Sequence, residues 1–205
     1  MRNIRFSEGL KARRFACCLS AIFCLGLASA SAGENTIGIA LATQRDPTAF
    51  DKSVSTVTAV SYSHAFDNNA ILAASLHYFD VSGSSAWHLN SQIGIGYRLA
   101  LSDAFAVIGT VNIGSRAQSD DVNFPYYSLQ GALDWKLTEA LNWSVLTYRY
   151  RNAFSTGYDF ETPALGTSVG LRLTDHSSIS LNYLREWDDG KVADDLLGLG
   201  YQFHF

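Results

Sequence analysis

An alternation of apolar and polar residues with a period of two runs through most of the chain and continues to its last residue. The final segment, LLGLGYQFHF, places Leu197, Leu199, Tyr201, Phe203 and Phe205 on one side and small or polar residues between them. The same pattern recurs in YYSLQGALDWKL and LNSQIGIGYRLAL. Period two is the pattern of a β-strand with two unlike faces. We therefore predict an all-β protein whose strands carry one apolar face and one small, polar face.

Four acidic residues in short polar segments divide the chain evenly. Asp67, Asp103, Glu139 and Asp175 follow one another at intervals of 36 residues. Each is flanked by alternating segments, so we interpret each as the tight turn of a β-hairpin. Longer polar segments between them, such as SRAQSDDVNFP and REWDDGKVADD, predict five long loops. Four turns and five loops separate about ten antiparallel strands, and eight strands with one hairpin folded into the loops is the alternative.

One predicted strand, LNWSVLTYRYR, breaks the alternation. The apolar parity switches near Val145 and Leu146, which predicts a β-bulge at that point. Because a bulge changes which face later residues occupy, the facing of Arg149 and Arg151 stays open from the sequence.

The first 32 residues have the composition of a signal peptide. Five of the 15 Lys and Arg residues lie there, followed by the apolar run ACCLSAIFCLGLASA and a small-residue stretch ending in SASAG. A positive segment, a short apolar segment and an A-x-A site are typical of a secretory signal peptide. We predict a signal peptide over residues 1–32 and a single β-barrel domain over residues 33–205.

Removal of this segment leaves an acidic chain. One of the 19 acidic residues lies within it, so 10 basic and 18 acidic residues remain, with a formal net charge of −8. This charge argues against nucleic acid as a partner, because binding to phosphates requires a basic face. All three cysteines lie in the first 32 residues, which leaves no thiol for a disulfide or a metal site. No histidines show the spacing of metal ligands, and no cofactor motif is present.

The alternation also indicates the environment of the barrel. No later segment approaches the roughly 18 consecutive apolar residues of a transmembrane helix, yet aromatic residues are abundant. A strand with one apolar face suits a barrel that presents this face to lipid and a polar face to its lumen. The last strand is predicted to pair with NTIGIALAT near the start of the mature chain, which would close the barrel.

The signal peptide, the Leu-Thr-acid turns and the terminal YQFHF resemble the small outer-membrane β-barrel proteins of Gram-negative bacteria. This porin-like class implies an antiparallel, up-and-down transmembrane barrel in the cell outer membrane, in contact with lipid and lipopolysaccharide. The resemblance also implies that Tyr201, Phe203 and Phe205 form the C-terminal signal that the barrel assembly machinery reads.

Three basic residues are candidates for a site in the lumen. Arg98, Lys136 and Arg172 lie on the small, polar face, three to five residues before the acids of their turns. They are expected to form a basic ring near the periplasmic mouth that favours anionic solutes. The alternative is that they fill a narrow interior by pairing with Asp134 and the turn acids.

The functional hypothesis is a non-enzymatic, porin-like or structural barrel with surface-exposed loops that admits small solutes. A surface adhesin that interacts with host cells is one alternative. A barrel hydrolase is another, although the serine, histidine and acidic residues show no catalytic motif. A soluble periplasmic, lipocalin-like barrel would require the apolar face to point inward.

Overall fold

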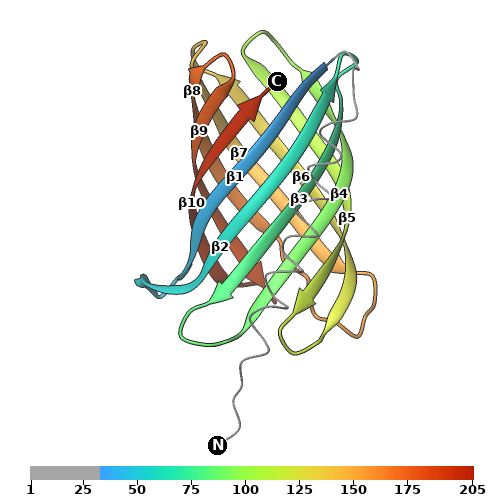
Figure 1. The fold of residues 1–205 in the computed structure, drawn as a ribbon, viewed down its shortest axis with the longest axis vertical. Coiled ribbons are helices and arrows are strands. Elements are labelled where there is room, and N and C mark those ends of the chain that lie inside the picture. Colours follow the sequence, from blue (N-terminus) through green and yellow to red (C-terminus); the bar gives the residue numbers. More distant parts are fainter. Residues whose placement is uncertain (1–32) are drawn as a thin grey trace, which may run out of the picture. The chain divides into compact units, whose positions relative to one another are not determined.

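The structure is a computed structural model that describes residues 33–205, so the predicted signal peptide, residues 1–32, lies outside the described residues. The described chain forms ten antiparallel strands that close into one barrel (Figure 1). Among residues 33–205 no helix is long and apolar enough to cross a membrane. Ten strands confirm the predicted fold and exclude the eight-stranded alternative. The strands are β1 (Gly33–Asp46), β2 (Ala49–Phe66), β3 (Ala70–Val81), β4 (Trp87–Ala100), β5 (Phe105–Gln118), β6 (Asn123–Lys136), β7 (Leu141–Ala153), β8 (Ala164–Thr174), β9 (Ser177–Asp188) and β10 (Lys191–His204).

The last strand closes the barrel by pairing with the first. The β1–β10 register runs from Thr36 opposite His204 to Arg45 opposite Asp195. Beyond it, backbone hydrogen bonds of 3.0 and 2.9 Å join Asn35 and Phe205 in both directions. Each strand therefore has a partner on both sides, and the described barrel has no free edge. The predicted pairing of the C-terminal strand with NTIGIALAT is confirmed.

The two faces of the wall differ as the alternation predicts. Large apolar side chains on the outer face are exposed, with Ile95 at 70% and Leu199 at 66%. The inner face carries small and polar side chains, including Asn90, Asn112 and Ser128, which are buried. A wall with an apolar outside and a polar inside is suited to lipid around it and water within it.

Aromatic side chains mark two levels on the outer face. Toward the short turns, the Trp135 ring stacks between Phe105 and Trp143, with centroid distances of 5.4 and 6.0 Å. Toward the opposite end of β6, the ring centroids of Tyr127 and Tyr150 lie 6.1 Å apart. The eight residue-to-residue steps from Tyr127 to Trp135 span about 26 Å along the strand, or about 20 Å along the axis of a barrel with about 40° strand tilt. This separation fits the apolar band of outer-membrane barrels, which aromatic girdles flank.

Strand β7 contains the predicted β-bulge. Leu146 lies opposite Leu133 of β6, whereas Ser144 lies opposite the next residue, Asp134. Val145 is therefore an extra residue in β7, and the register with β8 also shifts at this point.

The bulge determines which face the later residues of β7 occupy. Arg149 and Arg151 lie opposite Gln130 and Ser128, which belong to the inner face. Both arginines therefore face the lumen, and an uninterrupted alternation from Ser144 would have turned them toward lipid.

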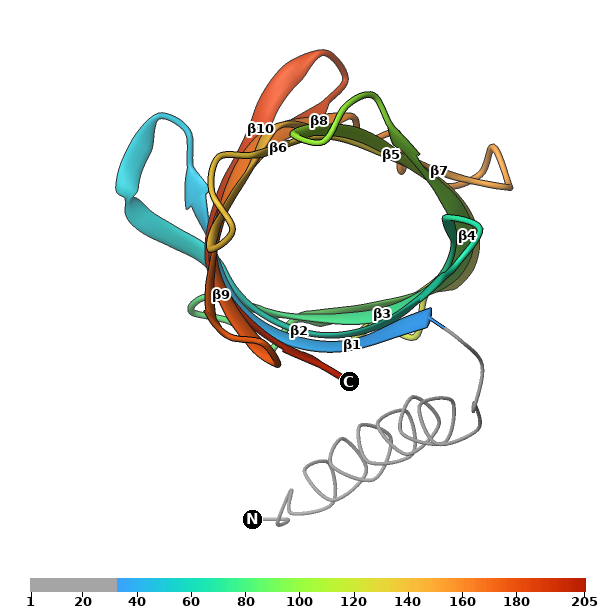
Figure 2. The same ribbon diagram turned by 90° about the horizontal axis from the view of Figure 1, so that it is seen from above.

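The two ends of the barrel differ less than the polar segments predict. One end has the four predicted tight turns, at residues 67–69, 101–104, 137–140 and 175–176. At the other end, only the connection 154–163 is long, while the other four contain two to five residues. The prediction of five long loops is wrong at these four positions, because the polar segments continue as strands into hairpins. Seen from above, the β1–β2 hairpin leans away from the barrel wall (Figure 2).

A charge placed on the outer face tests the assignment of the two faces. We expect Ile93→Lys, on the outer face of β4, to lower the free energy of unfolding by about 2–4 kcal/mol, because lipid does not solvate an ammonium group. The measurement is urea unfolding in lipid vesicles. Gln92→Lys is the matched control, because its side chain lines the lumen at the same depth. Equal destabilisation by both substitutions would contradict the assignment.

Candidate solute pathway in the lumen

Two cavities in the lumen are lined largely by inward-facing side chains. Their volumes are about 440 Å³ and about 250 Å³. His77, Thr147, Arg149 and Leu184 line both cavities, so they lie at the boundary between the two. The side chain of Arg149 therefore borders both cavities.

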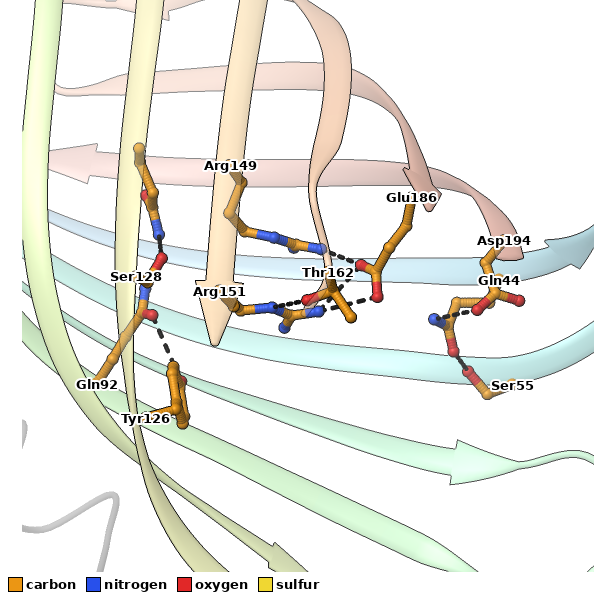
Figure 3. A network of polar contacts seen from close by, with 11 residues as sticks. Gln44, Ser55, Gln92, Tyr126, Ser128, Arg149, Arg151, Thr162, Glu186 and Asp194 are labelled. Atoms are coloured by element: carbon orange, nitrogen blue, oxygen red, sulfur yellow. Dashed lines mark hydrogen bonds and ion pairs between the residues drawn. The ribbon is translucent and has the colours of Figure 1, made fainter. Parts of the chain in front are cut away.

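An ion-pair network lies at this boundary (Figure 3). The Glu186 carboxylate of β9 accepts a hydrogen bond from Nη2 of Arg149. Nη2 of Arg151 donates to both Glu186 oxygens, each at 3.0 Å. The side chains of Arg151 and Glu186 are 7% and 16% exposed, so their attraction is screened less than that of a surface pair.

The connection between β7 and β8 places an aromatic ring against these basic residues. The ring centroid of Phe160 lies 5.0 Å from Cζ of Arg116 and 4.9 Å from Cζ of Arg151, a cation–π arrangement on both. Tyr126 contacts the same ring edge-on at 5.2 Å. Nε of Arg151 also donates to the Thr162 hydroxyl at 3.1 Å. The long connection is therefore anchored to the inner face of the barrel.

A second carboxylate lies beside Glu186. Asp194 of β10 is opposite Glu186 in the strand register. Nε2 of Gln44 donates to Asp194 at 3.3 Å, and the Ser55 hydroxyl donates to Oε1 of Gln44. The wall of the smaller cavity thus contains carboxylates from β9 and β10 together with the Arg149 guanidinium group of β7.

The predicted basic residues occupy the inner-face register close to the short turns. Arg98, Lys136 and Arg172 lie opposite inner-face residues of the neighbouring strands, and all three are exposed. Among residues 33–205, the ion pairs include none of these three. The Asp134 carboxylate accepts a hydrogen bond from the Ser144 hydroxyl at 2.6 Å. Their action as one basic ring stays a prediction.

The C-terminal aromatic residues lie where the alternation predicts. Tyr201 pairs with Ile39 on the outer face, and the rings of Phe203 and Phe205 stack at 6.0 Å. Their recognition by the assembly machinery stays a prediction.

Charge is distributed unevenly between the lumen and the rest of the described chain. The outer hairpins are the connections at the end of the barrel opposite the tight turns, with the strand ends that flank them. Apart from these hairpins, six of the 10 basic residues occupy the inner-face register, but only four of the 18 acidic residues do. The basic residues are Arg98, Arg116, Lys136, Arg149, Arg151 and Arg172, and the acidic residues are Glu34, Asp134, Glu186 and Asp194. The lumen is therefore basic within a chain whose residues 33–205 carry a net charge of −8.

A hydrogen-bonded chain that the sequence does not reveal lies near the short turns. Nε2 of His204 is 3.1 Å from the Ser178 hydroxyl, and its Nδ1 is 2.8 Å from Oε1 of Glu34. Serine, histidine and carboxylate in this order also occur in hydrolase triads. A triad needs further donors for an oxyanion, whereas the backbone around Ser178 is engaged in ladders with β8 and β10.

An acidic group lies on the outer hairpins. The carboxylates of Asp159, Asp188 and Asp189 come within 4.8 Å of one another and are exposed. Carboxylate oxygens are ligands for hard cations such as Ca²⁺, but exposed acidic groups also gather in water without one.

The chain matches no protein-family model, and no curated protein resembles it significantly in sequence. Several solved structures share its fold. The β-domain of the Bordetella autotransporter BrkA superposes with a TM-score of 0.55 at 10% identity, covering 84% of this chain and 99% of that one. An outer-membrane channel from Pseudomonas putida F1 gives 0.53 at 10% identity, covering 87% and 97%. The NanC porin gives 0.51 at 9% identity, covering 82% and 98%.

These neighbours agree with the two faces of the wall. A closed barrel with an apolar exterior and a polar lumen is the architecture of membrane barrels. The chain therefore has the fold of these outer-membrane β-barrels.

Removal of the Glu186 charge tests the network at the boundary. We expect Glu186→Gln to lower the free energy of unfolding by about 3 kcal/mol, because two shielded guanidinium groups lose their counter-charge. Asp188→Asn, on the same strand but exposed, is the control and is expected to have little effect. Denaturant unfolding of both variants in vesicles measures the difference, and a stability of Glu186→Gln equal to that of the control would contradict the role of this pair.

Proposed function

We propose that this protein is a non-enzymatic, porin-like channel whose lumen favours small anionic solutes. The observation that carries the proposal is the separation of charge: the lumen is basic, whereas the chain as a whole is acidic. A channel lined by one sign of charge concentrates solutes of the opposite sign, because the low-dielectric wall focuses the field.

Two levels along the lumen contribute to this preference. Arg98, Lys136 and Arg172 form the level near the short turns, which face the periplasm in barrels of this kind. Arg149, which lines both cavities, and Arg151, which lines the larger one, form the second level. An anion that leaves one level meets the next, which provides the several weak sites that conduction requires.

The outer face and the C-terminus define the other partners that we propose. The apolar band contacts lipid, and the outer hairpins contact lipopolysaccharide. Tyr201, Phe203 and Phe205 are read by the barrel assembly machinery during insertion.

Charge reversal at the periplasmic level tests the channel. In planar bilayers under a KCl gradient, we expect the wild-type protein to conduct with a preference for chloride. Arg98→Glu combined with Lys136→Glu should reduce the chloride-to-potassium permeability ratio by roughly threefold, because each change replaces an attraction by a repulsion.

The control for this experiment changes the same net charge outside the lumen. Lys52→Glu combined with Lys191→Glu alters two exposed residues of the outer hairpins and should leave the ratio nearly unchanged. An equal shift in both double variants, or the absence of any conductance, would exclude the proposed channel.

A chemical probe tests the non-enzymatic part of the proposal. Fluorophosphonates label serine hydroxyls that an adjacent base activates. We expect no labelling of the folded barrel, because Ser178 lacks oxyanion donors despite its contact with His204. Labelling that Ser178→Ala abolishes would instead support the hydrolase alternative.

A further inference from the structure

Inward-facing side chains differ in exposure between the two ends of the lumen. Among residues 33–205, those near the tight turns are exposed on five strands: Arg98, Lys136, Asn142, Arg172 and Gln202. Those toward the outer end, opposite the tight turns, are buried on seven strands: Gln44, Ser55, Phe79, Asn90, Tyr126, Arg151 and Ala164. Because water in an open mouth would leave such side chains exposed, the outer end is packed more tightly than the end at the tight turns.

The connection between β7 and β8 contributes an aromatic ring to this packing. Phe160 is 5% exposed although it belongs to a loop. Its ring meets those of Phe124 and Tyr126 edge-on, at centroid distances of 5.3 and 5.2 Å. Both of these residues face inward on β6. Phe160 is therefore inserted among side chains of the lumen.

Two buried side chains attach the connection to the inner face. The Phe160 ring lies over the guanidinium groups of Arg116 and Arg151, and the Thr162 hydroxyl accepts a hydrogen bond from Arg151 (Figure 3). By contrast, residues 154–159 and 161 are exposed. A segment with few buried contacts opens at a lower free energy than the strands beside it. The connection can therefore leave the lumen while the barrel wall stays folded.

Departure of the ring would change both the width and the charge of the outer end. The aromatic cluster would lose the ring that lies between Arg116 and Tyr126. The guanidinium groups of Arg116 and Arg151 would lose their cation–π partner and become available to anions. Opening of the outer end is therefore coupled to the exposure of two positive charges.

We propose that the β7–β8 connection, residues 154–163, is a gate at the outer end of the lumen, and that Phe160 holds it closed through Arg116 and Arg151. The closed gate narrows the pathway, and release of Phe160 widens it. This proposal rests on the proposed anion channel and adds to it a control of when the outer end is open.

The first test follows the gate without relying on conduction. Ala153 faces inward on β7 and belongs to the same buried cluster as Phe160. Residues 33–205 contain no cysteine, so Ala153→Cys provides a single thiol once Cys17, Cys18 and Cys24 are replaced by serine. In detergent micelles this thiol should react slowly with a water-soluble maleimide, because the closed gate covers it. Phe160→Leu keeps an apolar side chain but removes the ring, and should raise the rate at least fivefold.

Phe154→Leu is the matched control for this test. Phe154 belongs to the same connection, but it is 59% exposed and its ring contacts Tyr127 of the outer face. This change should leave the rate of labelling within twofold of that with Phe160 and Phe154 intact. Thermal unfolding checks that each variant is folded. Equal rates in the Phe160→Leu and Phe154→Leu chains would overturn the gate.

The second test measures current in planar bilayers. At a fixed voltage, Phe160→Leu should raise the time-averaged chloride current at least threefold above that of the wild type, whereas Phe154→Leu should not change it. Equal currents in Phe160→Leu and the wild type would overturn the gate and leave the channel standing. The absence of current in both would overturn the channel and the gate together.

Discussion

The structure depends on the pairing of the first strand with the last. Inside a bilayer an unpaired backbone N–H or C=O group has no water to bind, so a sheet must close before it can span. Here the closure extends to the last residue, where Asn35 and Phe205 bond in both directions. Once the sheet is closed, its apolar face lies toward lipid, and every second residue of each strand faces the lumen.

The side chains that face the lumen must therefore pack within it. A narrow barrel has to hold its own inward side chains, and charged groups among them require partners. Glu186 meets part of this need by bonding to two arginines, and Phe160 covers two guanidinium groups from the mouth. Among residues 33–205, the buried side-chain polar atoms left without a hydrogen-bond partner belong to Ser75, Asn90 and Arg149.

Local patterns predicted the wall but not the contacts inside it. The two faces, the closing pair and the bulge near Val145 follow from a period of two, which depends only on neighbours in the chain. The strand number follows from the evenly spaced turns and the polar segments between them. Arg149 and Glu186 are 37 residues apart, and their contact depends on the stagger of strands around the barrel. The polar segments misled the prediction of long loops because polarity indicates water around a segment and does not distinguish a hairpin from a loop.

Because of the bulge in β7, the number of residues in the strand matters for which face its side chains occupy, in addition to the identities of those residues. If Val145 were instead kept in a regular ladder, every charged residue would be preserved, yet each residue after Val145 would change face. Two guanidinium groups would then move from the lumen into the hydrocarbon, at about 2–4 kcal/mol each near the bilayer midplane. The bulge absorbs this one residue, so deletion of Val145 would remove the bulge and leave both arginines in the lumen. A single irregularity of the backbone, beside an uncharged side chain, thus determines where the positive charge of this strand lies.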